Sequence, residues 1–203
     1  MSDRKLTERL SEAGMPFVRR HLQHPTVAAL SRGDLPDSAA RAWLAQDYLF
    51  LLDEPRALTR LAWQAPTNHR QDLIDLAWGV IHEEIPNHMK MCAIYGADLD
   101  SARKSAACTS YTAWLLQSAS DYGIGLVALL SGLWGYSTLG RLMESPEEPR
   151  LRQWVESYKS PEFGALAKRF ADMVDETPVD AEQACDVFVA GLQHGIDFWN
   201  VSP

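Results

Sequence analysis

The chain has 203 residues, about the length of one domain. Its 19 lysines and arginines and its 27 aspartates and glutamates give a net charge of −8, which argues against nucleic acid or an anionic membrane as a general partner, because both are polyanions. An apolar fraction of 46% and a charged fraction of 23% exclude a disordered or fibrous chain. We therefore predict one globular domain over residues 1–203.

The cysteines are an odd number without a close pair, so a disulfide framework is not expected. They are Cys92, Cys108 and Cys185. Residues 1–10 contain no apolar core of a signal peptide. These features predict a cytoplasmic protein.

One uncharged segment, from Tyr122 to Gly140, has 19 residues and approaches the length that crosses a bilayer. It contains five glycines together with serine and threonine, and no second segment of this kind accompanies it. A helix buried on all sides in a protein core explains it better, so we predict no membrane partner.

Apolar residues recur with the period of an α-helix through most of the chain, and no long run alternates as a half-buried strand does. Leu126, Leu129, Leu130, Leu133 and Trp134 follow this pattern. We therefore predict an all-α fold with helices near residues 3–22, 37–60, 69–95, 99–118, 122–143, 149–158, 161–174 and 179–200.

Several helix starts combine a hydroxyl side chain, a proline and an acid, the usual composition of a helix N-terminus. They are Ser145-Pro146-Glu147, Ser160-Pro161-Glu162 and Thr177-Pro178-Val179-Asp180. Pro55 falls inside the helix predicted for 37–60, where it removes a backbone donor, so we expect a kink or an interruption there.

A single acid, Asp47, lies in the apolar segment 43–52. Its neighbours three and four residues away are large apolar side chains, so its carboxylate is predicted to face inward. Burial of an unpaired charge costs several kcal/mol, which means that Asp47 needs a ligand or a partner. A structural ion pair with Arg56 or Arg60 is the alternative to a functional role.

Glu84, His88 and Cys92 are four residues apart and line one stripe of a helix. This spacing is compatible with metal binding, but no second histidine joins it and no Glu-x-x-His pair repeats on two helices. We therefore predict no metal site and a solvated stripe as the alternative.

Aromatic residues recur close to these acids, and buried tyrosines among them need hydrogen-bond partners. They are Trp43, Tyr48, Phe50, Tyr111, Trp114, Trp134, Tyr136, Tyr158, Phe198 and Trp199. Core packing explains many such residues, whereas aromatic rings beside two buried acids would suit a flat, nitrogen-rich heterocycle. The sequence contains no glycine-rich phosphate loop, Gly-x-Ser-x-Gly motif or Cys-x-x-Cys pair.

Several short stretches in a fixed order resemble one known family. They are Leu44–Leu51 followed by Arg56-Ala57-Leu58, Ile81–His88, Trp134-Gly135-Tyr136, Trp154–Tyr158 followed by Ser160–Phe163, and Phe198-Trp199. Over essentially the whole chain, this pattern is similar to the TenA/thiaminase II family.

The resemblance implies a haem-oxygenase-like helical bundle without haem, a homodimer or homotetramer, and a pocket for the aminopyrimidine half of thiamin. It implies no cofactor. Asp47 stands where the family binds the amino group and nitrogen of the ring, and Glu84 matches an acid of the third helix. The substrate-binding residues that we predict beside Asp47 are Phe50, His88, Tyr111, Tyr136, Tyr158, His194 and Phe198.

Two positions depart from the family. Gly132 stands at the position of the nucleophilic cysteine, and a glycine cannot attack a pyrimidine carbon. Gly195, preceded by His194, stands at the position of the terminal glutamate. Glu84 is expected to direct water if burial raises its pKa, and His194 is expected to carry protons near Gly195.

Three hypotheses follow from the sequence. The first is a hydrolase of aminopyrimidine salvage that works without a cysteine, with Asp47 and Glu84 as its catalytic residues. The second is a heterocycle-binding protein that has lost catalysis, and the third is a different enzyme on the same scaffold, including a metal-dependent one.

Overall fold

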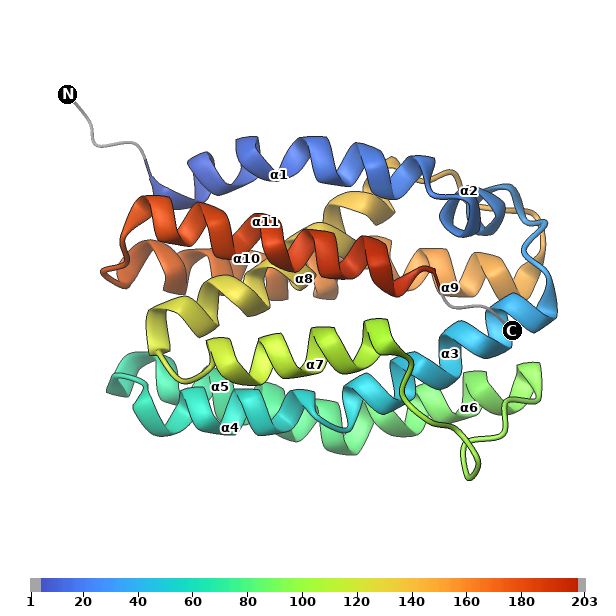
Figure 1. Ribbon diagram of the computed structural model, residues 1–203, viewed down its shortest axis with the longest axis horizontal. Helices are drawn as coiled ribbons and strands as arrows, with labels where there is room; N and C mark the ends of the chain where they lie inside the picture. Colours follow the sequence, from blue (N-terminus) through green and yellow to red (C-terminus); the bar gives the residue numbers. More distant parts are fainter. Residues whose placement is uncertain (1–4, 201–203) are drawn as a thin grey trace. The chain divides into compact units, whose positions relative to one another are not determined.

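In the computed structural model, which describes residues 5–200, the chain forms eleven α-helices and one π-helical turn, η1, without a β-strand (Figure 1). The elements are α1 (Leu6–Gln23), α2 (Pro25–Arg32), α3 (Asp37–Leu51), α4 (Glu54–Gln64), α5 (Thr67–Gly79), η1 (Val80–Glu84), α6 (Ile85–Tyr95), α7 (Ala106–Ser118), α8 (Tyr122–Leu142), α9 (Pro149–Lys159), α10 (Pro161–Glu176) and α11 (Ala181–Phe198). The prediction of an all-α fold is confirmed.

The chain divides into two compact units. Unit 1 comprises Met1–Leu35 and Leu126–Trp199, and unit 2 comprises Pro36–Gly125 and Asn200–Pro203. Helix α8 begins in unit 2 and continues in unit 1. A single domain over residues 1–203 stays a prediction.

In unit 1, helix α1 packs along α11 and also contacts α10 and α2, while α9 contacts α10 and α2. The core consists of large side chains that are almost fully buried, among them Leu10, Leu30, Leu130, Phe170 and Phe188. Burial of each such side chain stabilises the fold by about 1.5–3 kcal/mol.

In unit 2, helix α4 packs against α5 and α7, and helix α3 packs against α6 and α7. Leu44, Leu58, Leu61 and Leu73 are completely buried between these helices. The apolar stripe of α3 therefore faces inward, as its sequence pattern predicts.

Among the described residues, α8 is the one helix that is long and apolar enough to cross a membrane. Of its most apolar window, 78% is buried inside the protein. Leu126, Val127, Ala128, Leu129 and Leu130 are each at most 5% exposed, so consecutive faces of the helix are covered. This burial is what we predicted for the uncharged segment.

The long helix predicted for residues 37–60 is interrupted after Leu51, and α4 starts with Pro55 in its first turn. The interruption was expected, because proline cannot donate the hydrogen bond that a helix interior needs. The helix predicted for 69–95 is likewise divided into α5, η1 and α6. Pro86 has no N–H to donate, and the wider turn of η1 ends at Glu84, two residues before it.

The sequence analysis missed one helix and placed the start of another too early. Residues 25–32 form α2, which the sequence analysis missed because its N-cap is the imidazole of His24, an uncommon capping group that accepts from the Thr26 N–H at 3.2 Å. The helix predicted from residue 99 starts at Ala106. The Asp98 carboxylate accepts from the Asp100 and Ser101 N–H groups and holds the preceding residues in a turn.

Of the three predicted caps, Ser160 is confirmed, since its hydroxyl accepts from the Phe163 N–H at 3.1 Å. The other two were wrong. Helix α9 is capped by Glu148, and α11 is capped by Asp180 rather than Thr177, because a carboxylate accepts from N-terminal N–H groups more strongly than a hydroxyl does.

Candidate functional site

Asp47 lies on α3 in unit 2, and its carboxylate contacts His88 of α6. The Asp47 Oδ2 atom is 3.5 Å from the His88 Nδ1 atom, and the two side chains are 24% and 9% exposed. Burial raises the pKa of Asp47, and the charge of His88 opposes this effect. The carboxylate is thus largely inside the protein but open to water on one side.

The alternative partners of Asp47 lie elsewhere. Arg56 pairs with Asp53 at 2.7 Å, and Arg60 donates to the carbonyl oxygen of Leu116 at 3.3 Å. Arg56 and Arg60 therefore bind other partners, and neither forms the ion pair with Asp47 that was the alternative.

The hydrogen bond of the His88 ring determines which of its two nitrogen atoms faces Asp47. The His88 Nε2 atom is 2.8 Å from the carbonyl oxygen of Leu44, and a carbonyl can only accept, so Nε2 carries the hydrogen. The Cys92 thiol donates to the same carbonyl oxygen at 3.7 Å. His88 and Cys92 therefore share one face of α6, as predicted, and the Nδ1 atom faces the Asp47 carboxylate.

Two glutamates extend this group of acids. Glu84 ends the turn η1 and keeps contact with water, and Glu54 begins α4 and is half-buried. Burial raises the pKa of both carboxyl groups, and the neighbouring charge of Asp47 raises each of them further. Three carboxyl groups so close together do not all ionise near neutral pH.

Sequence analysis missed Glu54, because an acid in Asp53-Glu54-Pro55 resembles an ordinary first turn of a helix. The helix breaks between Leu51 and Glu54, so the seven-residue spacing from Asp47 does not by itself place the two side chains on one helix face. We call Asp47, Glu54, Glu84 and His88 the acidic cluster.

Two predicted binding residues border the acidic cluster. The rings of Phe50 and Tyr111 are 4.8 Å apart, with 38° between their planes. Tyr111 is 7% exposed, and its pKa is raised by burial and by the charges of Glu54 and Asp47. Unit 2 thus brings together the acids and two of the predicted aromatic residues.

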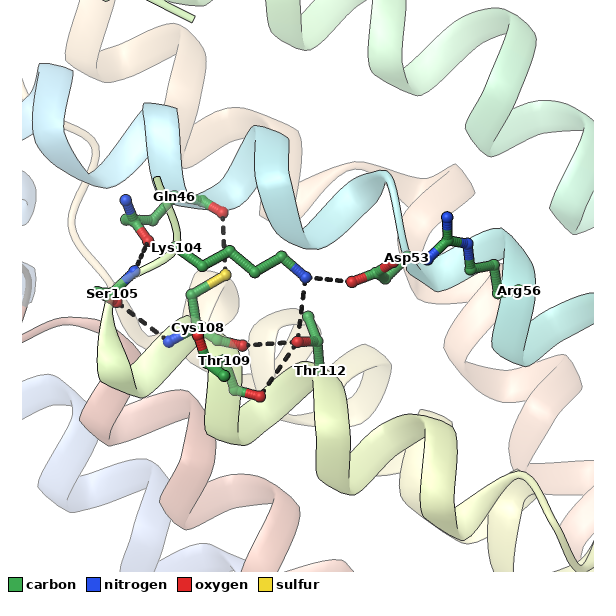
Figure 2. A network of polar contacts seen from close by, with 8 residues as sticks. All are labelled: Gln46, Asp53, Arg56, Lys104, Ser105, Cys108, Thr109 and Thr112. Carbon is green, nitrogen blue, oxygen red and sulfur yellow. Dashed lines mark hydrogen bonds and ion pairs between the residues drawn. The ribbon is translucent and has the colours of Figure 1, made fainter. Parts of the chain in front are cut away.

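A polar network beside Asp47 fixes helix α3 (Figure 2). The Gln46 amide oxygen accepts from the Ser105 N–H at 2.7 Å, and its amide nitrogen donates to the Arg103 carbonyl at 2.8 Å. Lys104 pairs with Asp53 at the end of α3. Because Gln46 is 8% exposed, these bonds tie the segment before α7 firmly to the helix that carries Asp47.

The remaining predicted binding residues lie in unit 1. The rings of Tyr136 and Tyr158 are 5.1 Å apart and half-buried, and the Trp154 indole donates to the Tyr158 hydroxyl at 3.1 Å. Gly140 allows this approach of α8 to α9, because a Cβ atom there would lie 2.8 Å from the Tyr158 backbone.

Phe198 and His194 differ from these tyrosines. Phe198 is 2% exposed, as a core side chain is, and His194 is half-buried, with a pKa that burial lowers against the charge of Asp197. Their binding roles stay predictions.

A second histidine, His21 of α1, lies beside Gly195. A Cβ atom at Gly195 would be 3.2 Å from the His21 Cε1 atom and 3.3 Å from its Nε2 atom. The His21 ring also stacks on Tyr136, with centroids 6.0 Å apart. Sequence analysis placed His194 in this role and missed His21. The signal that was available is its position three residues after Val18, which places both side chains on the same face of α1.

The cysteines offer no replacement for the missing nucleophile. Burial raises the pKa of Cys92 to about 12 and that of Cys108 to about 11, so both remain thiols at neutral pH. Within residues 5–200, no three His, Cys, Asp or Glu side chains are arranged as a metal site.

Comparison with known proteins identifies the family. Residues 15–202 match the TENA/THI-4/PQQC family. A Helicobacter pylori protein named aminopyrimidine aminohydrolase is 24% identical over 200 residues, which cover 89% of this chain and 90% of that protein. A longer Schizosaccharomyces pombe protein is 26% identical over 91% of this chain, which spans only 36% of its length.

Among solved structures, a TenA homologue from P. horikoshii OT3 has a TM-score of 0.89 at 22% identity, with 97% of both chains covered. This likeness shows the fold. The predicted resemblance to TenA proteins is confirmed, and the chain belongs to the TENA/THI-4/PQQC family.

Proposed function

We propose that this protein is a hydrolase that releases ammonia from an aminopyrimidine and that it works without a cysteine nucleophile. The observation that carries the proposal is the half-open carboxylate of Asp47, held against His88 among further acids with raised pKa values. The name of the Helicobacter pylori relative supports the substrate class.

Asp47 is suited to anchor the ring. Because its pKa is raised, its carboxyl group can take up a proton and donate it to a ring nitrogen, while its second oxygen accepts from the amino group. His88 holds the carboxyl group in place from the other side. Phe50 and Tyr111 supply aromatic surface next to this anchor.

Of the two glutamates, Glu84 is the general base that activates water and Glu54 is the general acid that protonates the leaving group. Glu84, with a pKa of about 7, is about half ionised at neutral pH and can act as a base, whereas Glu54, with a pKa raised to about 8, is mostly protonated. Glu84 takes one proton from water as the water oxygen forms a bond to the carbon atom that carries the leaving amino group. The carbon–nitrogen bond breaks, and Glu54 gives the proton with which the nitrogen leaves as ammonia.

The test is ammonia release from an aminopyrimidine that carries an aminomethyl arm, with wild type and Asp47→Ala. Alanine offers the ring neither a donor nor an acceptor, so we expect at least a hundredfold loss of kcat/KM, about 2.7 kcal/mol. Circular dichroism and melting temperature verify that the variant folds. If clean wild-type protein releases no ammonia, the proposal is wrong.

A second candidate is a binding protein without catalysis. Gly132 and Gly195, at the positions where the family resemblance leads us to expect a cysteine and a glutamate, favour it. Calorimetric binding of the aminopyrimidine in the absence of any product would support this candidate.

A homodimer or homotetramer and a cytoplasmic location stay predictions. Helices α4 and α5 expose Trp63, Ile74 and Trp78, which are 88%, 47% and 54% exposed, and Trp63 and Ile74 line a hollow of about 550 Å³. Apolar surface of this kind is typical of contacts between subunits. The molar mass in solution, measured by light scattering, tests the predicted oligomer.

A further inference from the structure

The break between α3 and α4 separates two residues of the acidic cluster. Asp47 lies on α3, and Glu54 is the first residue of α4, so the angle between the two helices sets the distance between their carboxyl groups. Within one continuous helix the backbone hydrogen bonds would fix this distance, but Pro55 has no N–H to contribute. The geometry of the break therefore depends on side-chain contacts.

Asp53 occupies the N-cap position of α4, but its carboxylate does not cap the helix. An N-cap carboxylate ordinarily accepts from the N–H of the second or third helical residue. The second residue is Pro55, which has no N–H, and the N–H of the third, Arg56, donates to the Asp53 carbonyl oxygen at 3.0 Å. The carboxylate of Asp53 is therefore released from capping and binds two cations instead.

The two cations on Asp53 come from different parts of the chain. Arg56 is three residues away on α4, is 72% exposed and pairs with one carboxylate oxygen at 2.7 Å, so this ion pair is local. Lys104 pairs with the other oxygen from the segment before α7, 51 residues along the chain (Figure 2). Because Lys104 is 26% exposed and Asp53 is 14% exposed, water and salt screen this pair less than the pair with Arg56. Of the two ion pairs, the one with Lys104 joins the break to another helix.

Further hydrogen bonds hold Lys104 in position. Its two neighbours in the chain, Arg103 and Ser105, are both bound to the Gln46 amide of α3, at 2.8 and 2.7 Å. Its ammonium group also donates to the Thr112 hydroxyl at 3.2 Å. The long side chain thus follows one path from the start of α7 to the break between α3 and α4 (Figure 2).

We propose that Lys104 is a positioning residue: by binding Asp53, it holds the neighbouring Glu54 among the other carboxyl groups of the acidic cluster. The proposal rests on the proposed function for the role of Glu54 as the general acid. The placement of Glu54 by Lys104 can, however, be measured without turnover.

The first experiment follows the carboxyl carbon of Glu54 by nuclear magnetic resonance, in protein with labelled glutamate, and Glu54→Gln assigns the signal. Among the described residues, the titratable groups that interact with Glu54 are Glu84 of η1, Asp47 of α3 and Tyr111 of α7. Burial and the two neighbouring acids raise the pKa of Glu54 to about 8. In Lys104→Met, we expect this pKa to fall by about one pH unit or more, because Glu54 turns away from the other acids toward water.

The sign of the change separates positioning from a direct effect of charge. Removal of a nearby cation disfavours the ionised carboxylate, so loss of the Lys104 charge alone would raise the pKa of Glu54. A raised pKa would therefore overturn the proposal. An unchanged pKa with a lower melting temperature would also overturn it, because Lys104 would then contribute to stability only.

Two variants serve as matched controls. Lys104→Arg keeps the charge and can still bind Asp53, so the pKa of Glu54 should stay at its wild-type value. Arg56→Met removes the other cation from the same carboxylate but breaks only a local contact, so we expect a change of at most about 0.5 pH unit. An equal fall in Arg56→Met and Lys104→Met would contradict the proposal, because the link to α7 would then have no specific effect.

The second experiment measures ammonia release from the aminopyrimidine with the aminomethyl arm. Because Glu54 acts on the leaving group after the ring has bound, Lys104→Met should lower kcat about tenfold and leave KM within about twofold of wild type. Lys104→Arg should restore kcat. A normal kcat of Lys104→Met beside active wild-type protein would overturn the proposal. Inactive wild-type protein with the expected fall in the pKa of Glu54 would instead count against the hydrolase alone.

A second variant keeps the proposal testable if Lys104→Met does not fold. Lys104→Gln introduces a polar side chain that suits the half-buried position but is too short to reach Asp53. We expect the same fall in the pKa of Glu54 and the same loss of kcat. Wild-type values of both quantities in Lys104→Gln would overturn the proposal.

Discussion

Burial acts in opposite directions on the polar groups of the two units. In the acidic cluster of unit 2, it raises the pKa values of Asp47, Glu54 and Glu84, whereas in unit 1 it lowers the pKa of His21. Both shifts favour the neutral form of the group. The formal charge of the sequence counts histidine as neutral, so it overstates the charge of the acidic cluster alone at neutral pH.

The acidic cluster of unit 2 and His21 of unit 1 differ in whether they exchange protons near neutral pH. The carboxyl groups of unit 2 raise one another's pKa values toward neutrality, where small changes in the surroundings move a proton. His21, whose pKa is lowered by burial to about 4, stays neutral near neutral pH. The carboxyl groups of unit 2 can therefore exchange protons near neutral pH, whereas His21 does not.

The largest effect should come from removing the base of the acidic cluster. Glu84→Gln keeps the size of the side chain but cannot take a proton from water, so we expect kcat for ammonia release to fall about a hundredfold. The Kd of the aminopyrimidine should change little. Steady-state kinetics together with calorimetry measure both quantities.

Glu83→Gln is the matched control, because Glu83 is an exposed acid in the same turn η1. It should retain wild-type kcat. Full activity of Glu84→Gln would remove Glu84 from the mechanism.

An intermediate effect should follow when the network that fixes α3 is broken. Gln46→Ala removes the two hydrogen bonds to the Ser105 N–H and the Arg103 carbonyl, each worth about 1 kcal/mol, so we expect the free energy of unfolding to fall by about 2 kcal/mol. Denaturant titration measures this change. Hydrogen exchange should accelerate at the start of α7 but not in α1.

Gln193→Ala provides the comparison in unit 1. Gln193 bonds to Asp197 one turn along the partly exposed face of α11, and its loss should cost at most about 0.5 kcal/mol. Equal costs for the two variants would show that the Gln46 network adds nothing specific.

The smallest effect concerns pH. Because the pKa of Glu54 is raised from 4.5 to about 8, the folded state holds a proton that the unfolded state has lost, and stability falls as pH rises through this range. Glu54→Gln removes this loss. Since Glu54 is half-buried and water screens its charge, we expect a gain of about 1 kcal/mol at pH 8 and little change at pH 4.

Glu182→Gln, an exposed acid at the start of α11, should leave the pH dependence of stability unchanged. A stability of Glu54→Gln that falls with pH as steeply as in wild type would refute the assigned protonation of Glu54.

For His21, the pH dependence of stability has the opposite sign. Its pKa is lowered from 6.5 to about 4, so the unfolded state binds the proton first, and this histidine destabilises the fold as pH falls through that range. The two regions thus limit stability at opposite ends of the pH scale.

The sequence by itself determined the helical fold, the inward position of Asp47 and the shared face of His88 and Cys92. Each depends on the 3.6-residue period, which is a local property of the chain. The sequence also located the helix break near Pro55, because a proline lacks the backbone N–H that a helix interior needs, whatever surrounds it.

Only the tertiary structure decided which groups meet. Glu54 joins Asp47 across the break between α3 and α4, and His21 of α1 meets Gly195 of α11. These residues come from separate helices, and no helical period relates α1 to α11. Their proximity and the resulting pKa shifts arise from packing, because burial is a property of the folded chain and not of any segment within it.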